Sequence, residues 1–150
     1  KAVHAAKTLN KWALGDDTGI FVSALNGAPG INSRYYAGPT ATDKDNRKKL
    51  LEEMTSFSDL ERAAYVECAL ALANPEGLYK TVTAVCEGLI SNDERGNNGF
   101  GYDPLFYKHD YGRKTFAELA EDVKNRVSHR GKALEKMLLT LQAVVNALSH

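Results

Sequence analysis

The chain has 150 residues, enough for one domain, and a domain of this size buries about two thirds of the surface that its unfolded chain exposes. Its composition, with 43% hydrophobic and 25% charged residues, is ordinary for a globular protein. Because 19 Lys and Arg residues balance 19 Asp and Glu residues, the overall charge recruits neither nucleic acid nor an acidic membrane, and no apolar run is long enough to span a bilayer.

The first 25 residues predict a helix followed by a strand. Residues 1–10 have helical character but begin with neither Met nor an N-cap residue, so we expect an earlier segment to precede them. Residues 12–15 look extended, and residues 16–19 form a turn cluster. The apolar run at 20–25 predicts a buried strand.

Turn chemistry at 26–30 and a loop without periodicity at 31–42 lead into a second helix. Thr42 and Asp45 have the spacing of a weak capping box, and the helix that they open has an apolar face made of Leu50, Leu51 and Met54.

The runs at 62–73 and 78–90 are rich in strand formers and flank Asn74-Pro75-Glu76-Gly77, a pattern typical of a hairpin. The alanine content of the first run leaves a helix as the alternative there. A loop rich in Gly and Asn follows at 91–103.

Two further helices are predicted near the end of the chain. The capping box Thr115-Phe116-Ala117-Glu118 predicts the start of a short helix, and Ser128 can cap the last one. Apolar residues follow the helical period in that last helix: Ala133, Leu134, Met137, Leu138, Leu141, Val144, Val145 and Leu148. Together the elements predict one α/β domain over residues 1–150, with a mixed central sheet and flanking helices.

Two cysteines, Cys68 and Cys86, lie in apolar, strand-like runs, where a free thiol behaves as a small hydrophobe. Their number and spacing indicate neither a disulfide framework nor a zinc site, and a disulfide between neighbouring strands is the less favoured alternative. No signal peptide leads the chain, so we expect a reduced, cytoplasmic protein.

Three motifs could carry chemistry. Asp16-Asp17 places two adjacent carboxylates before a glycine, and Mg²⁺ prefers one or two carboxylates with phosphate oxygens and waters. A carboxylate there could also take a proton from water. For the dipeptide alone, a solvated turn is the favoured reading.

The second motif is Gly96-Asn97-Asn98-Gly99-Phe100-Gly101-Tyr102-Asp103-Pro104. Its glycines let a flat ligand approach the backbone and stack on an aromatic ring, while Asp103 can accept hydrogen bonds. A rigid loop whose aromatic residues fill the core is equally compatible with this motif.

The third motif comprises Lys124 and Ser128-His129-Arg130, which bracket a helix start and cluster hydrogen-bond donors there. The alternative is that these side chains are solvated on the surface. If the three motifs form one pocket, its donors suit a 6-oxo purine. Adenine presents an amino group at that position, which would leave buried donors unpaired at about 1–3 kcal/mol each.

Gly99-Phe100-Gly101-Tyr102-Asp103-Pro104, followed by Lys124 and Ser128-His129-Arg130, resembles the inosine/xanthosine triphosphate pyrophosphatase family. Similarity also covers Lys1–Lys7, residues 16–19, 25–30, 50–51, 115–118 and 133–134, which is nearly the whole chain. The resemblance implies a homodimeric, two-lobed α/β fold around a nucleotide cleft. It also implies Mg²⁺-dependent hydrolysis of non-standard purine nucleoside triphosphates (ITP, dITP and XTP) to the monophosphate and pyrophosphate.

The resemblance also implies roles for single residues. It makes Asp17 the general base and a metal ligand, with Asp16 as a second metal ligand. The implied substrate-binding residues are Thr18, Phe100, Gly101, Tyr102, Asp103, Lys124, His129 and Arg130.

The sequence departs from this family in three places. The family begins with a strand, a Thr/Ser-Gly-Asn…Lys phosphate loop, a helix and an acidic metal ligand, and none of these precedes Lys1. The domain is therefore expected to be N-terminally truncated and, if it begins at Lys1, to have weak or no turnover. Arg34 is displaced from the usual Ser-x-Arg-Tyr position and is left out of the predicted site. Glu94 stands where the family often has Pro, which predicts a looser loop before Gly99.

Two other hypotheses remain open. One is a catalytically impaired nucleotide-binding or dimerisation fragment of the same fold, which the absent phosphate loop motivates. The other, ranked lower, is a pyrophosphohydrolase of a different fold built around Asp16-Asp17, which lacks the Glu-rich helix that such metal sites commonly use.

Overall fold

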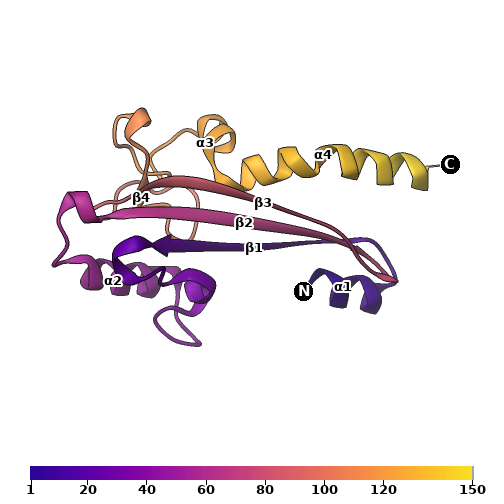
Figure 1. The fold of residues 1–150 in the computed structure, drawn as a ribbon, viewed down its shortest axis with the longest axis horizontal. Coiled ribbons are helices and arrows are strands. Elements are labelled where there is room, and N and C mark those ends of the chain that lie inside the picture. The colour runs from indigo at the N-terminus through magenta and orange to yellow at the C-terminus, as the bar shows by residue number, and fades with distance from the viewer. Residues whose placement is uncertain (150) are drawn as a thin grey trace.

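The computed structural model describes residues 1–149 and contains a long, twisted sheet with helices on both sides (Figure 1). Its strands are β1 (Ala13–Val22), β2 (Ala63–Asn74), β3 (Gly77–Ile90) and β4 (Phe106–Tyr107), in the order β1-β2-β3-β4. The predicted α/β class with a central sheet and flanking helices is confirmed. All strand pairings in the described part of the chain are antiparallel, whereas the sequence suggested a mixed sheet.

The predicted hairpin is confirmed and forms the longest pairing in the sheet. β2 and β3 pair from Ala63↔Leu89 to Asn74↔Gly77. The side-chain Oδ1 of Asn74 accepts hydrogen bonds from the backbone N–H groups of Glu76 and Gly77, which closes the turn. Gly77 has a φ of 146°, a conformation that only glycine adopts without strain. Despite its alanines, the first run is therefore a strand.

Residues 16–19 lie inside β1, so the turn predicted for them is wrong. Ten consecutive residues of β1 pair with β2, from Ala13↔Ala73 to Val22↔Ala64, and this continuous ladder outweighs the local turn composition. The strand also ends earlier than predicted. Ser23–Leu25 form a 3₁₀ turn, and Asn26 closes it at a left-handed φ of 53°.

The helices are α1 (Ala2–Leu9), α2 (Asp43–Met54), α3 (Glu121–Val127) and α4 (His129–Leu148), and a 3₁₀ helix spans Gly30–Tyr35 in the predicted loop. The capping box of Thr42 and Asp45 is present at the start of α2. Ser128 caps α4 as predicted, because its Oγ accepts a hydrogen bond from the N–H of Gly131.

Residues 115–118 form a turn, not the predicted helix, and α3 begins at Glu121. Half of the capping box forms, since the carboxylate of Glu118 accepts from the N–H of Thr115. The hydroxyl of Thr115, however, is buried and donates to the carbonyl of Arg95. It is therefore not available to cap a helix.

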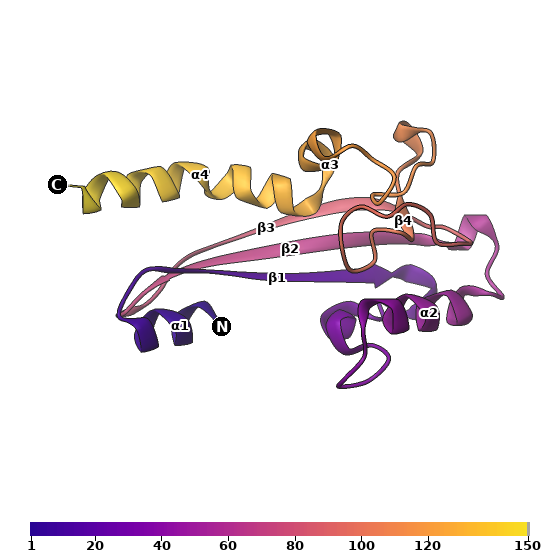
Figure 2. The same ribbon diagram turned by 180° about the vertical axis from the view of Figure 1, so that it is seen from behind.

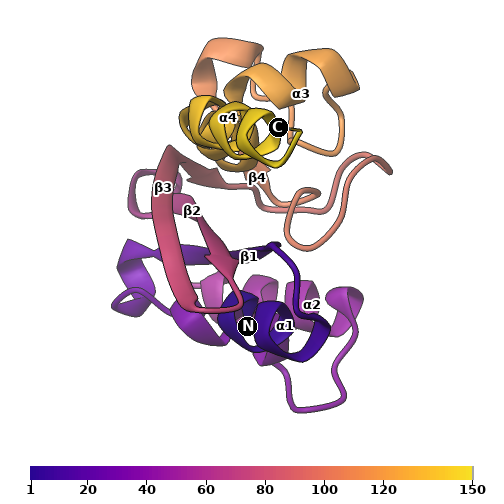
Figure 3. The same cartoon turned by 90° about the vertical axis from the view of Figure 1, so that its right-hand side faces the viewer.

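α1 and α4 cover opposite faces of the sheet, as the end-on view and the view from behind show (Figures 2 and 3). Alternate residues of β2 explain this arrangement: Cys68 and Leu70 pack under α4, whereas Ala71 and Ala73 pack on α1. Within residues 1–149, no helix combines the length and the apolar character that crossing a membrane requires.

The main core lies at the far end of the sheet from the β2–β3 turn and joins the strands to α2 and to the segment after β3. Its largest fully buried side chains include Ile20, Leu50, Met54, Phe106 and Phe116. Both cysteines are buried and free, as expected, and burial raises the pKa of each thiol.

One buried cation fastens this core to the loop that follows β3. The guanidinium of Arg62 donates to the carbonyls of Ile90 and Ser91, each at 2.8 Å, and to those of Met54 and Phe57 at 2.8 and 3.3 Å. The single side chain of Arg62 thus provides hydrogen-bond donors for backbone carbonyl groups at the C-terminal end of α2 and at the end of β3.

Replacing Arg62 by Ala should reduce the free energy of unfolding by about 3 kcal/mol or more, because it leaves several buried carbonyls without a donor. Urea denaturation followed by circular dichroism measures the loss. The matched control is Arg126→Ala, since Arg126 is exposed on α3. Equal losses in the two variants would contradict a structural role for Arg62.

Candidate functional site

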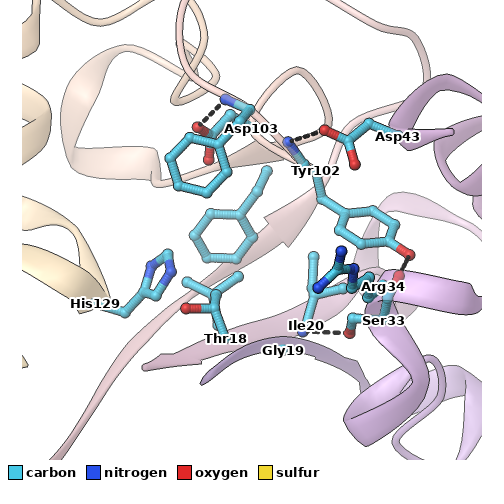
Figure 4. A pocket seen from close by; sticks show the side chains of 13 residues that line it. Thr18, Gly19, Ile20, Ser33, Arg34, Asp43, Tyr102, Asp103 and His129 are labelled. Atoms are coloured by element: carbon cyan, nitrogen blue, oxygen red, sulfur yellow. Dashed lines mark hydrogen bonds between the residues drawn. The ribbon is translucent and has the colours of Figure 1, made fainter. Parts of the chain in front are cut away.

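A cavity of about 160 Å³ opens beside β1, between the start of α2 and the start of α4 (Figure 4). It draws its walls from β1, the 3₁₀ helix, α2, the loop before β4 and α4. The residues that line it are Thr18, Gly19, Ile20, Ser33, Arg34, Asp43, Val66, Phe100, Gly101, Tyr102, Asp103, Phe106 and His129.

The structure brings most of the predicted substrate-binding residues together. Thr18, Phe100, Gly101, Tyr102, Asp103 and His129 line the cavity. Lys124 and Arg130 line an adjoining groove, which shares Phe100 and His129 with the cavity. Residues separated by more than a hundred positions in the chain thus surround one aromatic ring.

The sequence missed other lining residues, among them Ser33, Arg34, Asp43 and Phe106. Arg34 was excluded because it is shifted within its motif, yet it reaches the cavity from the 3₁₀ helix. Asp43 lies in the first turn of α2, and no local pattern connects it with a loop nearly 60 residues away. Only the fold reveals these neighbours.

Asp103 fixes the loop that carries Phe100. Its Oδ2 accepts from the N–H of Phe100 at 3.0 Å and from Nζ of Lys124 at 2.5 Å. Gly99 has a φ of 78°, and a Cβ at that position would collide with the Asp103 carboxylate. Glycine is therefore required by both conformation and space.

Tyr102 links the same loop to β1 through a chain of hydrogen bonds. Its hydroxyl donates to the carbonyl of Ser33 at 2.7 Å, and Oγ of Ser33 accepts from the N–H of Ile20 at 2.9 Å (Figure 4). Burial raises the pKa of Tyr102 far above its ordinary value, so the phenol stays a neutral donor.

Two cations contact the half-exposed ring of Phe100. The guanidinium carbon of Arg130 lies 4.4 Å from the ring centroid, and Nζ of Lys124 lies 4.9 Å from it. Arg130 also donates to Oδ2 of Asp16 at 2.6 Å, and Thr18 donates to Oδ1 of Asp16 at 3.0 Å. Asp16 therefore connects β1 to the start of α4.

Asp16 and Asp17 point to opposite faces of β1, as neighbouring residues of a strand must. Asp16 shares its face with Arg130 and with Cys68, whose Sγ lies 3.9 Å from Oδ1. The Asp17 side chain is 80% exposed on the other face and lies 3.8 Å from Nζ of Lys1. The two carboxylates do not converge on one point.

The residues present fit a magnesium ion only in part. Asp16 is already neutralised by Arg130, whereas Asp17 is accessible and could supply one carboxylate oxygen. Within residues 1–149 no group of three or more acidic, His or Cys side chains could hold a metal. Mg²⁺ commonly takes one or two carboxylates and completes its shell with substrate phosphates and water, which is compatible with Asp17 as a single ligand.

His129 is buried and lines the cavity, and it is not solvated on the surface. Neither ring nitrogen has a hydrogen-bond partner in the described part of the chain. Burial, reinforced by the nearby cations Arg130 and Lys124, lowers the pKa of this imidazole to about 4. The neutral ring thus offers one donor and one acceptor toward a ligand.

The presence of Glu94 where the family often has Pro predicted a looser loop before Gly99, but the Glu94 side chain is engaged in a contact. It forms an ion pair with Arg47 of α2. The start of the loop is therefore held by a side chain in place of a rigid proline ring.

The buried imidazole predicts a loss of folding stability in acid. The unfolded chain takes up this proton near pH 6.5 and the folded chain only near pH 4, so stability falls as the pH drops through that window. The full shift is worth roughly 3 kcal/mol. Urea denaturation at several pH values should show a shallower fall for His129→Gln, with exposed His4→Gln as control. Parallel curves for His129→Gln and the parent would contradict the assignment.

The chain is similar to known proteins along nearly its whole length. The dITP/XTP pyrophosphatase of Chlamydia caviae is 57% identical over 143 residues, which are 95% of this chain and 69% of the relative. The dITP/XTP pyrophosphatase of Protochlamydia amoebophila is also 57% identical and is covered to 71%.

Solved structures show the same fold. A HAM1 protein from Coxiella burnetii superimposes with a TM-score of 0.84 at 43% identity, over 95% of this chain and 73% of that one. The Staphylococcus aureus Ham1 protein gives 0.84 at 37% identity, over 95% and 72%. The sequence pattern of the Ham1 family matches residues 1–140. With this match, relatives of such identity and the shared fold, the chain belongs to the Ham1 family.

Proposed function

We propose that the protein hydrolyses non-standard purine nucleoside triphosphates (ITP, dITP and XTP) to the nucleoside monophosphate and pyrophosphate. The observation that carries the proposal is the cavity in which Phe100, Asp103 and His129 meet Thr18 of the edge strand, in a Ham1-family chain. The relatives with the name dITP/XTP pyrophosphatase support it.

The polar groups around Phe100 favour a 6-oxo purine over adenine. Lys124 and Arg130 carry donors only, and each has more N–H groups than its ion pair with Asp103 or Asp16 uses. Both lie close to the ring on which a base would stack. An oxo group accepts from such donors, whereas the amino group of adenine cannot. Each buried donor left unpaired costs about 1–3 kcal/mol, which corresponds to a preference of roughly tenfold or more.

The phosphates would cross the open edge of the sheet. Thr18 and Gly19 line both the base cavity and a shallow pocket on the other face, which also contains Asp17. Backbone hydrogen-bonding groups alternate in direction along a strand, and the N–H of Ile20 points away from β2 toward Ser33. The N–H of Thr18 therefore points to the same edge, where it could donate to a phosphate oxygen.

Asp17 is the proposed general base. It would take a proton from the water whose oxygen attacks the α-phosphorus, while the bond between that phosphorus and the bridging oxygen breaks and pyrophosphate leaves. We further propose Mg²⁺ as cofactor with Asp17 as protein ligand. When bound, the ion would neutralise phosphate charge. A cytoplasmic location is proposed as well, since the substrates are soluble nucleotides.

Pyrophosphate release from ITP in the presence of Mg²⁺ tests the catalytic assignment. Asp17→Asn keeps size and polarity but cannot accept the proton, so its kcat should fall by about 10²–10⁴-fold. The parent should also prefer ITP to ATP by roughly tenfold or more in kcat/KM. Equal rates for Asp17→Asn and the parent would rule out Asp17 as the base, and an equal rate with ATP would rule out the proposed base selection.

A homodimer is proposed as the assembly. Leu134, Leu138, Val145 and Leu148 form an exposed apolar stripe along α4, next to the residues that pack on the sheet. Contiguous exposed apolar surface of this kind marks contact sites.

Light scattering after gel filtration should give the mass of two chains. Leu138→Glu, which places a charge within the stripe, should shift the protein to one chain while its circular dichroism spectrum stays unchanged. Leu60→Glu is the control, because Leu60 is exposed far from α4 in sequence and outside the stripe. A monomeric parent, or a dimer that tolerates both charges equally, would contradict the proposal.

A further inference from the structure

Two side chains of α2 form hydrogen bonds with Gly101, in the loop that contains Phe100 and Tyr102. The N–H of Gly101 donates to Oδ2 of Asp43 at 3.0 Å, and the carbonyl of Gly101 accepts from a terminal nitrogen of Arg47 at 2.8 Å (Figure 4 draws the first of these bonds). Asp43 and Arg47 are four residues apart, so they lie on one face of the helix. Both polar backbone groups of one loop residue are thus held by one helical turn.

The same arginine also holds the beginning of the loop. Nε of Arg47 forms the ion pair with Glu94, and its side chain is only 17% exposed. A guanidinium presents several donors in a rigid plane, so one Arg47 conformation serves both acceptors. Lys could reach either Glu94 or Gly101 but could not span both with fixed geometry.

These contacts matter because packing alone does not hold the Phe100 ring in place. It is 51% exposed and precedes Gly101, whose φ of 60° shows a left-handed backbone. On one side the loop is anchored by the hydrogen bonds of Asp103 to Phe100 and Lys124. On the other side the anchors are Asp43 and Arg47. An exposed stacking ring that is fixed before binding loses less conformational freedom when a base arrives.

We infer that Arg47, held in place by Glu94, is a positioning residue for purine binding: it fixes the Phe100 loop from the side opposite Lys124. The inference rests on the proposed function for its ligand class, a 6-oxo purine nucleotide. It assigns to Arg47 no contact with the substrate and no part in the chemical step.

The experiment measures binding and turnover separately in Arg47→Ala. Calorimetry with inosine monophosphate should show an affinity about tenfold weaker than that of the parent, and the KM for ITP should rise by a similar factor with kcat within about twofold. The affinity and the KM of Arg47→Lys should lie between those of Arg47→Ala and those of the parent. The matched control is Lys48→Ala, because Lys48 is the neighbouring residue on α2 and its side chain is 77% exposed. A purely structural role would lower thermal stability without separating KM from kcat, and that result would overturn the inference.

A second readout does not depend on any nucleotide. Hydrogen exchange of the peptide that contains residues 96–103 should be faster in Arg47→Ala than in Lys48→Ala, with the exchange of β2 and β3 unchanged. Unchanged loop exchange would overturn the inference, even in a protein that hydrolyses ITP. A parent that neither binds inosine monophosphate nor cleaves ITP, but whose loop responds to Arg47→Ala, would instead contradict the proposed function. If Arg47→Ala fails to fold, Glu94→Gln supplies the same measurements, with smaller changes in the same directions.

Discussion

The carboxylate of Asp103 is the constraint on which the candidate site depends. It is almost fully buried, and one of its oxygens receives both the N–H of Phe100 and the ammonium of Lys124. A buried charge is tolerated only when it is paired and hydrogen-bonded, so these partners are obligatory. Because Phe100 belongs to a loop and Lys124 to α3, their shared acceptor determines how that loop meets the helical side of the cavity.

A second charged contact positions the strand side. Arg130 reaches from the first turn of α4 to Asp16 on β1, and its guanidinium also lies against Phe100. Partly buried arginine–carboxylate pairs have defined geometry, which ties the end of one helix to the middle of the edge strand. The aromatic ring thus lies where strand, loop and helix meet, and the base pocket is a product of all three.

Much of this arrangement could be predicted from local patterns. The hairpin turn at Asn74–Gly77 and the caps at Thr42 and Ser128 depend on neighbours only a few residues away, so the sequence contains their signals. Long-range competition explains the failures. Residues 16–19 have the composition of a turn, but ten cross-strand pairs hold them in a strand. The hydroxyl of Thr115 donates to the carbonyl of Arg95 and therefore does not cap a helix. Which face Asp16 and Asp17 occupy, and which helix meets Gly101, are decided by strand pairing and packing that no short window contains.

The placement of the acidic pair on β1 has a consequence for association. In the described part of the chain the other side of β1 is occupied at Ile20 and Val22, which donate to Ser33 and Ala28, but residues 13–18 pair only with β2. The backbone groups of that first part of the strand could pair with another extended chain. If two copies paired there in antiparallel fashion around Asp17, the exposed carboxylate of Asp17 in one copy would face that of the other copy and repel it. The residue proposed as the general base would thereby also disfavour edge-to-edge pairing of two copies through β1.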